Sequence, residues 1–95
     1  DKAVGESVAD PLKYYRNNTA NTRTLLECCV AAGVKHFVFS STAAVYGMPP
    51  GGVADETTPT VPINPYGWSK LMREQMLRDV AAATSLRYVA LRYFN

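Results

Sequence analysis

A tyrosine and a lysine four residues apart are the side chains in this sequence whose types and spacing could carry out acid–base chemistry. They lie in the stretch NPYGWSK as Tyr66 and Lys70. Residues four apart on a helix share one face, so the phenol and the ammonium are expected to lie together, with Ser69 turned aside. A free phenol holds its proton up to about pH 10, but a nearby cation favours the phenolate. The pairing therefore predicts a tyrosine that accepts a proton near neutral pH.

Polar residues also stand at the ends of two expected strands. The runs KHFVFSS, residues 35–41, and LRYVALRYF, residues 86–94, are short, β-branched and aromatic. They show little alternation, which predicts strands of a parallel sheet that are buried on both faces. Sites in such sheets collect beyond the carboxyl ends of the strands. Those ends carry Ser40, Ser41 and Thr42 in the first run, and Tyr93, Phe94 and Asn95 in the second.

Two helices and one long loop complete the expected arrangement. The first helix is expected from Pro11 to about Ala32, with Asp10 as its N-cap and Gly33 at its stop. The second is expected over residues 66–83. The order helix, strand, loop, helix, strand predicts an α/β fold with a parallel sheet. Residues 42–65 hold five of the six prolines, and we expect an ordered loop there with the apolar anchors Val45, Tyr46, Val53 and Ile63.

Composition excludes several classes of protein. The 95 residues are 47% apolar and 19% charged, which argues against disorder, and no run approaches the roughly 18 apolar residues of a membrane span. The net charge is only +2 and the basic residues are scattered, so no nucleic-acid surface is expected. The adjacent cysteines Cys28 and Cys29 fit reduced thiols in a reducing, cytoplasmic compartment, and no metal-binding spacing occurs. Both ends look cut, which predicts a piece of a longer protein.

Four blocks in order carry a resemblance to a known family. The segments FSSTAAVYG and YGWSK resemble the extended short-chain dehydrogenase/reductase family. With DKAVGESVADPLKYYRNN, NPYGWSKLMREQML and ALRYFN, the chain is most similar to the members that epimerise UDP-sugars at C4. The resemblance implies that residues 1–95 are the central part of an NAD-binding, Rossmann-like domain with a doubly wound parallel sheet. It also implies that the glycine-rich loop precedes Asp1 and that the uridine-binding region follows Asn95.

The resemblance further implies a role for each site residue. Its catalytic residues would be Tyr66 as the base, Lys70 as its partner and Thr42, whose hydroxyl helps pass the proton. Contacts to the NAD cofactor would come from Lys2, Asn17, Ser40, Ser41, Tyr66, Lys70 and Tyr93. The UDP-sugar substrate would meet Thr42, Tyr66 and Asn95, and no metal ion would take part.

The implied activity is the interconversion of UDP-glucose and UDP-galactose through transient oxidation at C4, in a homodimer, with residues 1–95 inactive alone. Another sugar-nucleotide epimerase, dehydratase, decarboxylase or reductase of the same fold is an alternative. So is a non-catalytic dinucleotide-binding relative. Related dehydratases carry acidic residues directly after the catalytic threonine, where this sequence has Ala43 and Ala44. That difference favours an epimerase.

Overall fold

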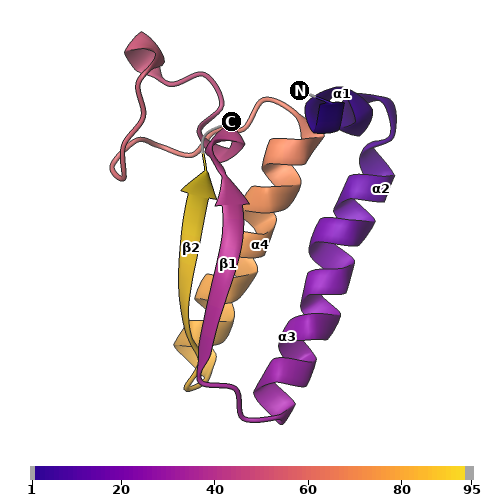
Figure 1. The fold of residues 1–95 in the computed structure, drawn as a ribbon, viewed down its shortest axis with the longest axis vertical. Helices are drawn as coiled ribbons and strands as arrows, with labels where there is room; N and C mark the ends of the chain where they lie inside the picture. Colours follow the sequence, from indigo (N-terminus) through magenta and orange to yellow (C-terminus); the bar gives the residue numbers. More distant parts are fainter. Residues whose placement is uncertain (1, 94–95) are drawn as a thin grey trace.

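A computed structural model describes residues 2–93, a small α/β unit in which helices pack against a two-stranded sheet (Figure 1). In chain order its elements are α1 (Lys2–Ala9), α2 (Pro11–Tyr15), the π-helical turn η1 (Arg16–Ala20), α3 (Asn21–Ala31), β1 (His36–Thr42), the 3₁₀ turns η2 (Ala43–Tyr46) and η3 (Pro50–Gly52), α4 (Pro65–Ala83) and β2 (Arg87–Tyr93). Among these residues, no helix combines the length and apolar character that crossing a bilayer requires.

The two strands are parallel neighbours, as the sequence predicts. Their register runs from the pair His36 and Arg87 to the pair Thr42 and Tyr93. Helix α4 supplies the crossover between them, so both strands end at the same edge of the sheet, beside the start of α4 (Figure 1). The α/β class and parallel sheet are confirmed, and this edge is where the fold places a site.

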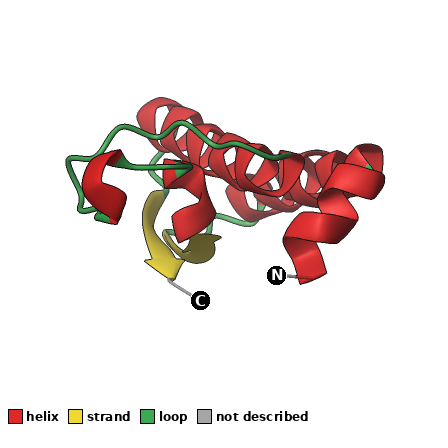
Figure 2. Cartoon of the chain, turned by 90° about the horizontal axis from the view of Figure 1, so that it is seen from above, coloured by secondary structure: helices red, strands yellow, loops and turns green. Residues whose placement is uncertain are grey.

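Only one face of the sheet is covered by helices. Figure 2 shows the long helices together on one side of the strands. The core between them contains Leu26, Phe39, Leu77 and Leu86. On the opposite face, Val38 is 70% exposed and Val89 is 53% exposed. The prediction of strands buried on both faces is therefore wrong for the described residues, because none of these helices lies over that face.

The predicted helix 11–32 exists as one continuous helical run, but it is not uniform. It starts at Pro11, and Gly33 follows its end with φ +75°, as expected of a left-handed stop. Asp10 is the N-cap residue, as predicted, but its side chain makes no capping hydrogen bond. The π-helical turn η1 interrupts the run, and the hydroxyl of Thr19 donates to the carbonyl of Tyr15 there. Helix α1 was not predicted either; it is short and includes Gly5, a poor helix former.

The long loop is anchored at its first part only. Val45 and Tyr46 are buried, as expected, whereas Val53 and Ile63 are exposed and do not act as anchors. Gly47 has φ +66°, and a Cβ atom there would lie 1.9 Å from the carbonyl oxygen of Val61. The two ends of the loop thus close on each other at a position that only glycine can occupy.

Candidate active site

The first turn of α4 is held in place by polar side chains outside the helix. The side chain of Asn64 is the N-cap and accepts a hydrogen bond from the amide of Gly67 at 2.8 Å. The hydroxyl of Ser7 in α1 accepts from the amide of Tyr66 at 3.1 Å. Ser7 is fully buried and donates its own hydrogen to the carbonyl of Val4. These bonds fix the backbone of Tyr66 from two sides.

A glycine brings this turn against the end of β1. A Cβ atom on Gly67 would lie 2.7 Å from the carbonyl oxygen of Ala44 and 3.0 Å from Cβ of Pro62. Any larger residue would therefore push α4 away from η2. Ala44 is two residues beyond Thr42, so the close approach places Tyr66 and Thr42 at the same edge of the sheet. Sequence reasoning missed both Ser7 and Gly67, although a glycine in a helix immediately after a candidate base is a recognisable signal.

Thr42 is buried where β1 ends. Its Oγ1 atom accepts a hydrogen bond from the amide of Ala44 at 3.2 Å. The hydroxyl hydrogen is not used in that bond and can be donated to another oxygen. Its partner in the sheet register is Tyr93, and paired residues of neighbouring strands project from the same face. Tyr93 is exposed there.

Tyr66 and Lys70 lie together as the spacing predicts. The Nζ atom of Lys70 is 5.9 Å from the ring centroid of Tyr66 and 5.9 Å from that of Phe39. Tyr14 packs edge-on against the ring of Tyr66, with centroids 6.1 Å apart. Burial lowers the pKa of Lys70, and the nearby guanidinium of Arg73 lowers it further. The site thus places a half-buried cation beside a phenol.

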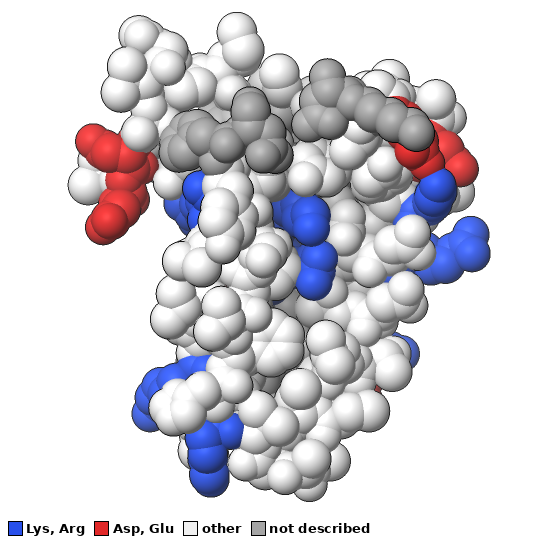
Figure 3. Space-filling view, viewed as in Figure 1, with Lys and Arg blue, Asp and Glu red and all other residues white. Residues whose placement is uncertain are grey.

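A second basic side chain stands next to Lys70. The guanidinium carbon of Arg73 is 4.3 Å from the centroid of Phe39, the ring that Lys70 also faces. Figure 3 shows basic side chains gathered between β1 and the α2–α3 run, with acidic ones only at the margins of that view. Within residues 2–93, no group of three His, Cys, Asp or Glu is arranged for a metal ion. Lys70 and Arg73 thus bring two basic side chains to the same aromatic ring.

The predicted cofactor contact Asn17 lies exposed in the π-helical turn, and its neighbour Asn18 makes the contacts to α4. The amide nitrogen of Asn18 donates to the hydroxyl of Ser69 at 3.0 Å, and its oxygen accepts from Arg73 at 3.2 Å. The Nε atom of Arg73 is buried without a partner among the described residues. We call Asn18, Ser69 and Arg73 the asparagine cluster.

The remaining predicted contacts are dispersed. Ser40 is exposed on the open face of the sheet, whereas Ser41 is buried and donates to Glu74. Lys2 lies in α1, and its side chain is not described; Asn95 lies outside the described residues. Their proposed roles stay predictions. Cys28 and Cys29 are free thiols.

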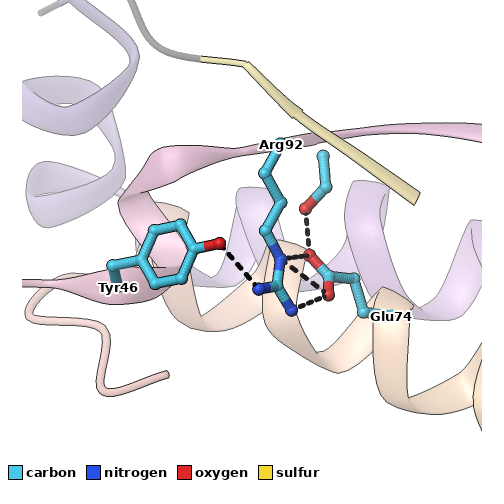
Figure 4. Close-up of polar contacts among 4 residues, drawn as sticks. Tyr46, Glu74 and Arg92 are labelled. Carbon is cyan, nitrogen blue, oxygen red and sulfur yellow. Dashed lines mark hydrogen bonds and ion pairs between the residues drawn. The ribbon is translucent and has the colours of Figure 1, made fainter. Parts of the chain in front are cut away.

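An ion pair that sequence reasoning missed joins α4 to both strands (Figure 4). Arg92 donates to both carboxylate oxygens of Glu74, with an Nη2–Oε1 distance of 2.6 Å and an Nε–Oε2 distance of 3.1 Å. Arg92 also donates to the hydroxyl of Tyr46 at 3.0 Å, and Ser41 donates to Oε2 of Glu74. Glu74 is only 5% exposed. We call Ser41, Tyr46, Glu74 and Arg92 the Glu74 network.

Comparison of the chain with known proteins finds similar sequences and structures among 4-epimerases of UDP-sugars. The sequence profile of the NAD dependent epimerase/dehydratase family matches residues 1–95. A UDP-glucose 4-epimerase of Azospirillum brasilense is 66% identical over 97% of this chain. The UDP-Glc/GlcNAc 4-epimerase of Campylobacter jejuni superposes with a TM-score of 0.94 at 56% identity over 97% of this chain. UDP-glucose 4-epimerase from Bifidobacterium longum, solved with NAD+ and UDP, gives 0.91 at 52% identity, also over 97%.

The match covers a minor part of each relative. The chain spans 26% of the Azospirillum protein and 28% of each of the two structures. These similarities cover Tyr66, Lys70 and Thr42 together with the elements that position them. The rest of each relative has no counterpart in residues 1–95.

Proposed function

Because the chain belongs to the NAD dependent epimerase/dehydratase family, we propose that the full-length protein containing it interconverts UDP-glucose and UDP-galactose through transient oxidation of the sugar at C4. One observation carries this proposal. Gly67 seats the first turn of α4 against the turn after Thr42, so the Tyr66–Lys70 pair and the threonine hydroxyl share one sheet edge. A proton acceptor, a cation and a hydroxyl donor at one edge are what C4 oxidation needs from the protein.

Each side chain has a defined task in this proposal. Tyr66 accepts the proton of the sugar 4-hydroxyl during oxidation and returns it during reduction. Lys70 places its ammonium beside the phenol, where a cation can compensate negative charge on the phenol oxygen. Thr42 donates its free hydroxyl hydrogen to the sugar oxygen, which orients the sugar and connects it to Tyr66.

The donor set fits NAD as the cofactor. Lys70 is half-buried, and its ammonium makes no hydrogen bond to any described residue, which suits a ribose hydroxyl as partner. Together with Lys70, we propose Lys2, Asn17, Ser40, Ser41 and Tyr93 as the residues of this chain that hold the cofactor. When the C4 alcohol is oxidised, Tyr66 takes the proton of the hydroxyl group. The hydrogen on C4 leaves as a hydride, which NAD accepts and later returns.

The residues after Thr42 favour epimerisation over dehydration. A 4,6-dehydratase must also remove a proton from C5 and protonate the leaving hydroxyl at C6, which takes a further acid and base. Ala43 and Ala44 can neither donate nor accept a proton. The nearest acids in sequence, Asp55 and Glu56, are exposed in the loop. Hydrogen bonds from Thr57 lower the pKa of Asp55, which disfavours the protonated form that an acid needs.

We also propose that the full-length protein is a cytoplasmic homodimer. The long helices carry exposed apolar side chains that a second copy could cover, among them Leu25, Val30 and Met72. The free thiols of Cys28 and Cys29 suit a reducing compartment. Sedimentation velocity of the full-length protein, with Val30→Glu as the disrupting variant, tests the dimer, and a monomeric wild type contradicts it.

Product analysis of the full-length protein tests the function. Given UDP-galactose, the purified protein should form UDP-glucose, with NAD retained and no 4-keto-6-deoxy sugar released. Chromatography of the sugar nucleotides separates the three species. Accumulation of the 4-keto-6-deoxy product would contradict the assignment, because it would require an acid from outside residues 1–95.

A further inference from the structure

Three of the four members of the Glu74 network, all except Tyr46, stand next to or one helical turn from a residue of the proposed site. Ser41 precedes Thr42, and Arg92 precedes Tyr93. Glu74 follows Lys70 by four residues, so Tyr66, Lys70 and Glu74 recur along one side of α4. Ser41 and Arg92 are themselves a pair in the sheet register. The network therefore joins the helix that carries the base to both strands, one residue before Thr42 in β1 and one residue before Tyr93 in β2.

We propose that Glu74 and Arg92 are positioning residues that hold α4 at a fixed height and rotation over the strand ends, and so align Tyr66 with Thr42. This inference rests on the proposed function. The two groups act through the helix and the strands, and neither touches the substrate.

The geometry explains why an ion pair does this better than apolar packing. Apolar contacts are not directional, so a helix can slide over a sheet at small cost. A guanidinium that binds both carboxylate oxygens fixes direction as well as distance. Here a third donor, Ser41, reaches the same carboxylate from β1, and Tyr46 of η2 accepts from Arg92. Four elements, α4, β1, β2 and η2, are thus held by one set of hydrogen bonds.

The same contacts argue against a catalytic role. Both oxygens of Glu74 accept hydrogen bonds from Arg92, and one also accepts from Ser41. The hydrogen bond to Glu74 raises the pKa of Arg92 further above its already high value. The arginine therefore stays charged throughout the working pH range. Loosening the network should change the size of kcat and leave the pH at which kcat is half-maximal where it is.

The test compares two network variants with a matched control in the full-length protein. Glu74→Gln removes the charge and keeps the shape, and Tyr46→Phe removes one acceptor and keeps the ring. Glu27→Gln removes the acid of the exposed Arg23–Glu27 pair on α3 and serves as the control. We expect Glu74→Gln to lower kcat by about 10- to 100-fold, since small misplacements of reacting groups have effects of that size. Tyr46→Phe should lower kcat less, and the control should match wild type.

Four further readouts separate positioning from general loss of structure. The KM for UDP-galactose and the bound NAD content should stay near wild type in both variants, and the pH profile should not move. Amide hydrogen exchange at residues 66–70 should accelerate. A kcat for Glu74→Gln within about twofold of wild type, or exchange that accelerates only around residue 74, would overturn the inference. If the wild type does not convert UDP-galactose, the proposed function fails, and the exchange measurement still decides whether the network holds the first turn of α4.

Discussion

The Glu74 network and the asparagine cluster both include side chains of α4, but they differ in how completely their charges and hydrogen-bonding atoms are paired. In the Glu74 network, a carboxylate and a guanidinium compensate each other and two hydroxyls complete their bonds. In the asparagine cluster, Asn18 and Ser69 are neutral, and the charge on Arg73 has no acid beside it in the described contacts. The Nε atom of Arg73 is buried without a partner there. The network lies toward the strands, and the cluster lies toward the π-helical turn.

This difference indicates that the side of α4 that carries the Glu74 network is held in one arrangement, whereas the side that carries the asparagine cluster can rearrange. A compensated buried pair has one favourable arrangement, and removing either partner leaves a costly buried charge. A charge without a counterion gains less from its surroundings and is held mainly by packing against Phe39. We therefore expect replacement of an arginine by methionine to destabilise the protein strongly on one side of α4 and hardly at all on the other.

Arg92→Met should have the largest effect on stability. It leaves the carboxylate of Glu74 buried and uncompensated, which costs about 3–5 kcal/mol in the free energy of unfolding. Urea denaturation of the full-length protein, with Glu27→Gln as the exposed control, measures this. A loss below about 1 kcal/mol, the size typical of an exposed pair, would remove the contrast between the two groups.

Gly67→Ala should have an intermediate effect on stability, because a shift of α4 disturbs the Glu74 network and the asparagine cluster together. Alanine favours a helix by about 1 kcal/mol over glycine, but its Cβ would lie 2.7 Å from the carbonyl oxygen of Ala44. The backbone must shift, and overpacking of this kind costs about 1–3 kcal/mol. Thermal melting of the variant measures the cost. The matched control is Gly5→Ala, where an added Cβ meets nothing within 4 Å. This substitution should stabilise α1, because alanine favours a helix over glycine.

Arg73→Met should have the smallest effect on stability, within about 0.5 kcal/mol of zero or slightly favourable, since it removes a charge that burial disfavours. It should also raise the pKa of Lys70 toward its ordinary value, because the guanidinium now lowers it. Lysine-specific NMR titration of wild type and variant measures that shift. A destabilisation as large as that of Arg92→Met would show that the asparagine cluster is as essential to the fold as the Glu74 network.

Much of this arrangement was accessible from the sequence because its signals are local. Pro11 and Gly33 mark the ends of a helical run, and the spacing of Tyr66 and Lys70 places them on one face; the structure has both features. The strands matched within one residue at their starts and ends. Each of these inferences needs only neighbours within a few positions along the chain.

What the sequence did not reveal depends on contacts between distant segments. Ser41 and Glu74 are 33 residues apart, and Ser7 and Tyr66 are 59 apart, so no periodicity indicates either contact. The signal that was available is chemical: Arg92 follows Tyr88 and Ala90 on one face of its strand, and buried charges occur in pairs. The one-sided burial of the sheet follows from which helices are present, which the strand sequences alone do not specify.

If Tyr66 is the proton acceptor at this sheet edge, the substitution Tyr66→Phe should remove most of the activity. The measurement is the rate of UDP-glucose formation from UDP-galactose by the full-length protein, together with its bound NAD content. Phenylalanine keeps the ring that packs against Tyr14 and Lys70 and removes only the hydroxyl. We expect kcat to fall by about 10²- to 10⁴-fold, the usual contribution of a general base, with NAD still bound. A variant that keeps a rate within about threefold of wild type would contradict it, because no general base contributes so little.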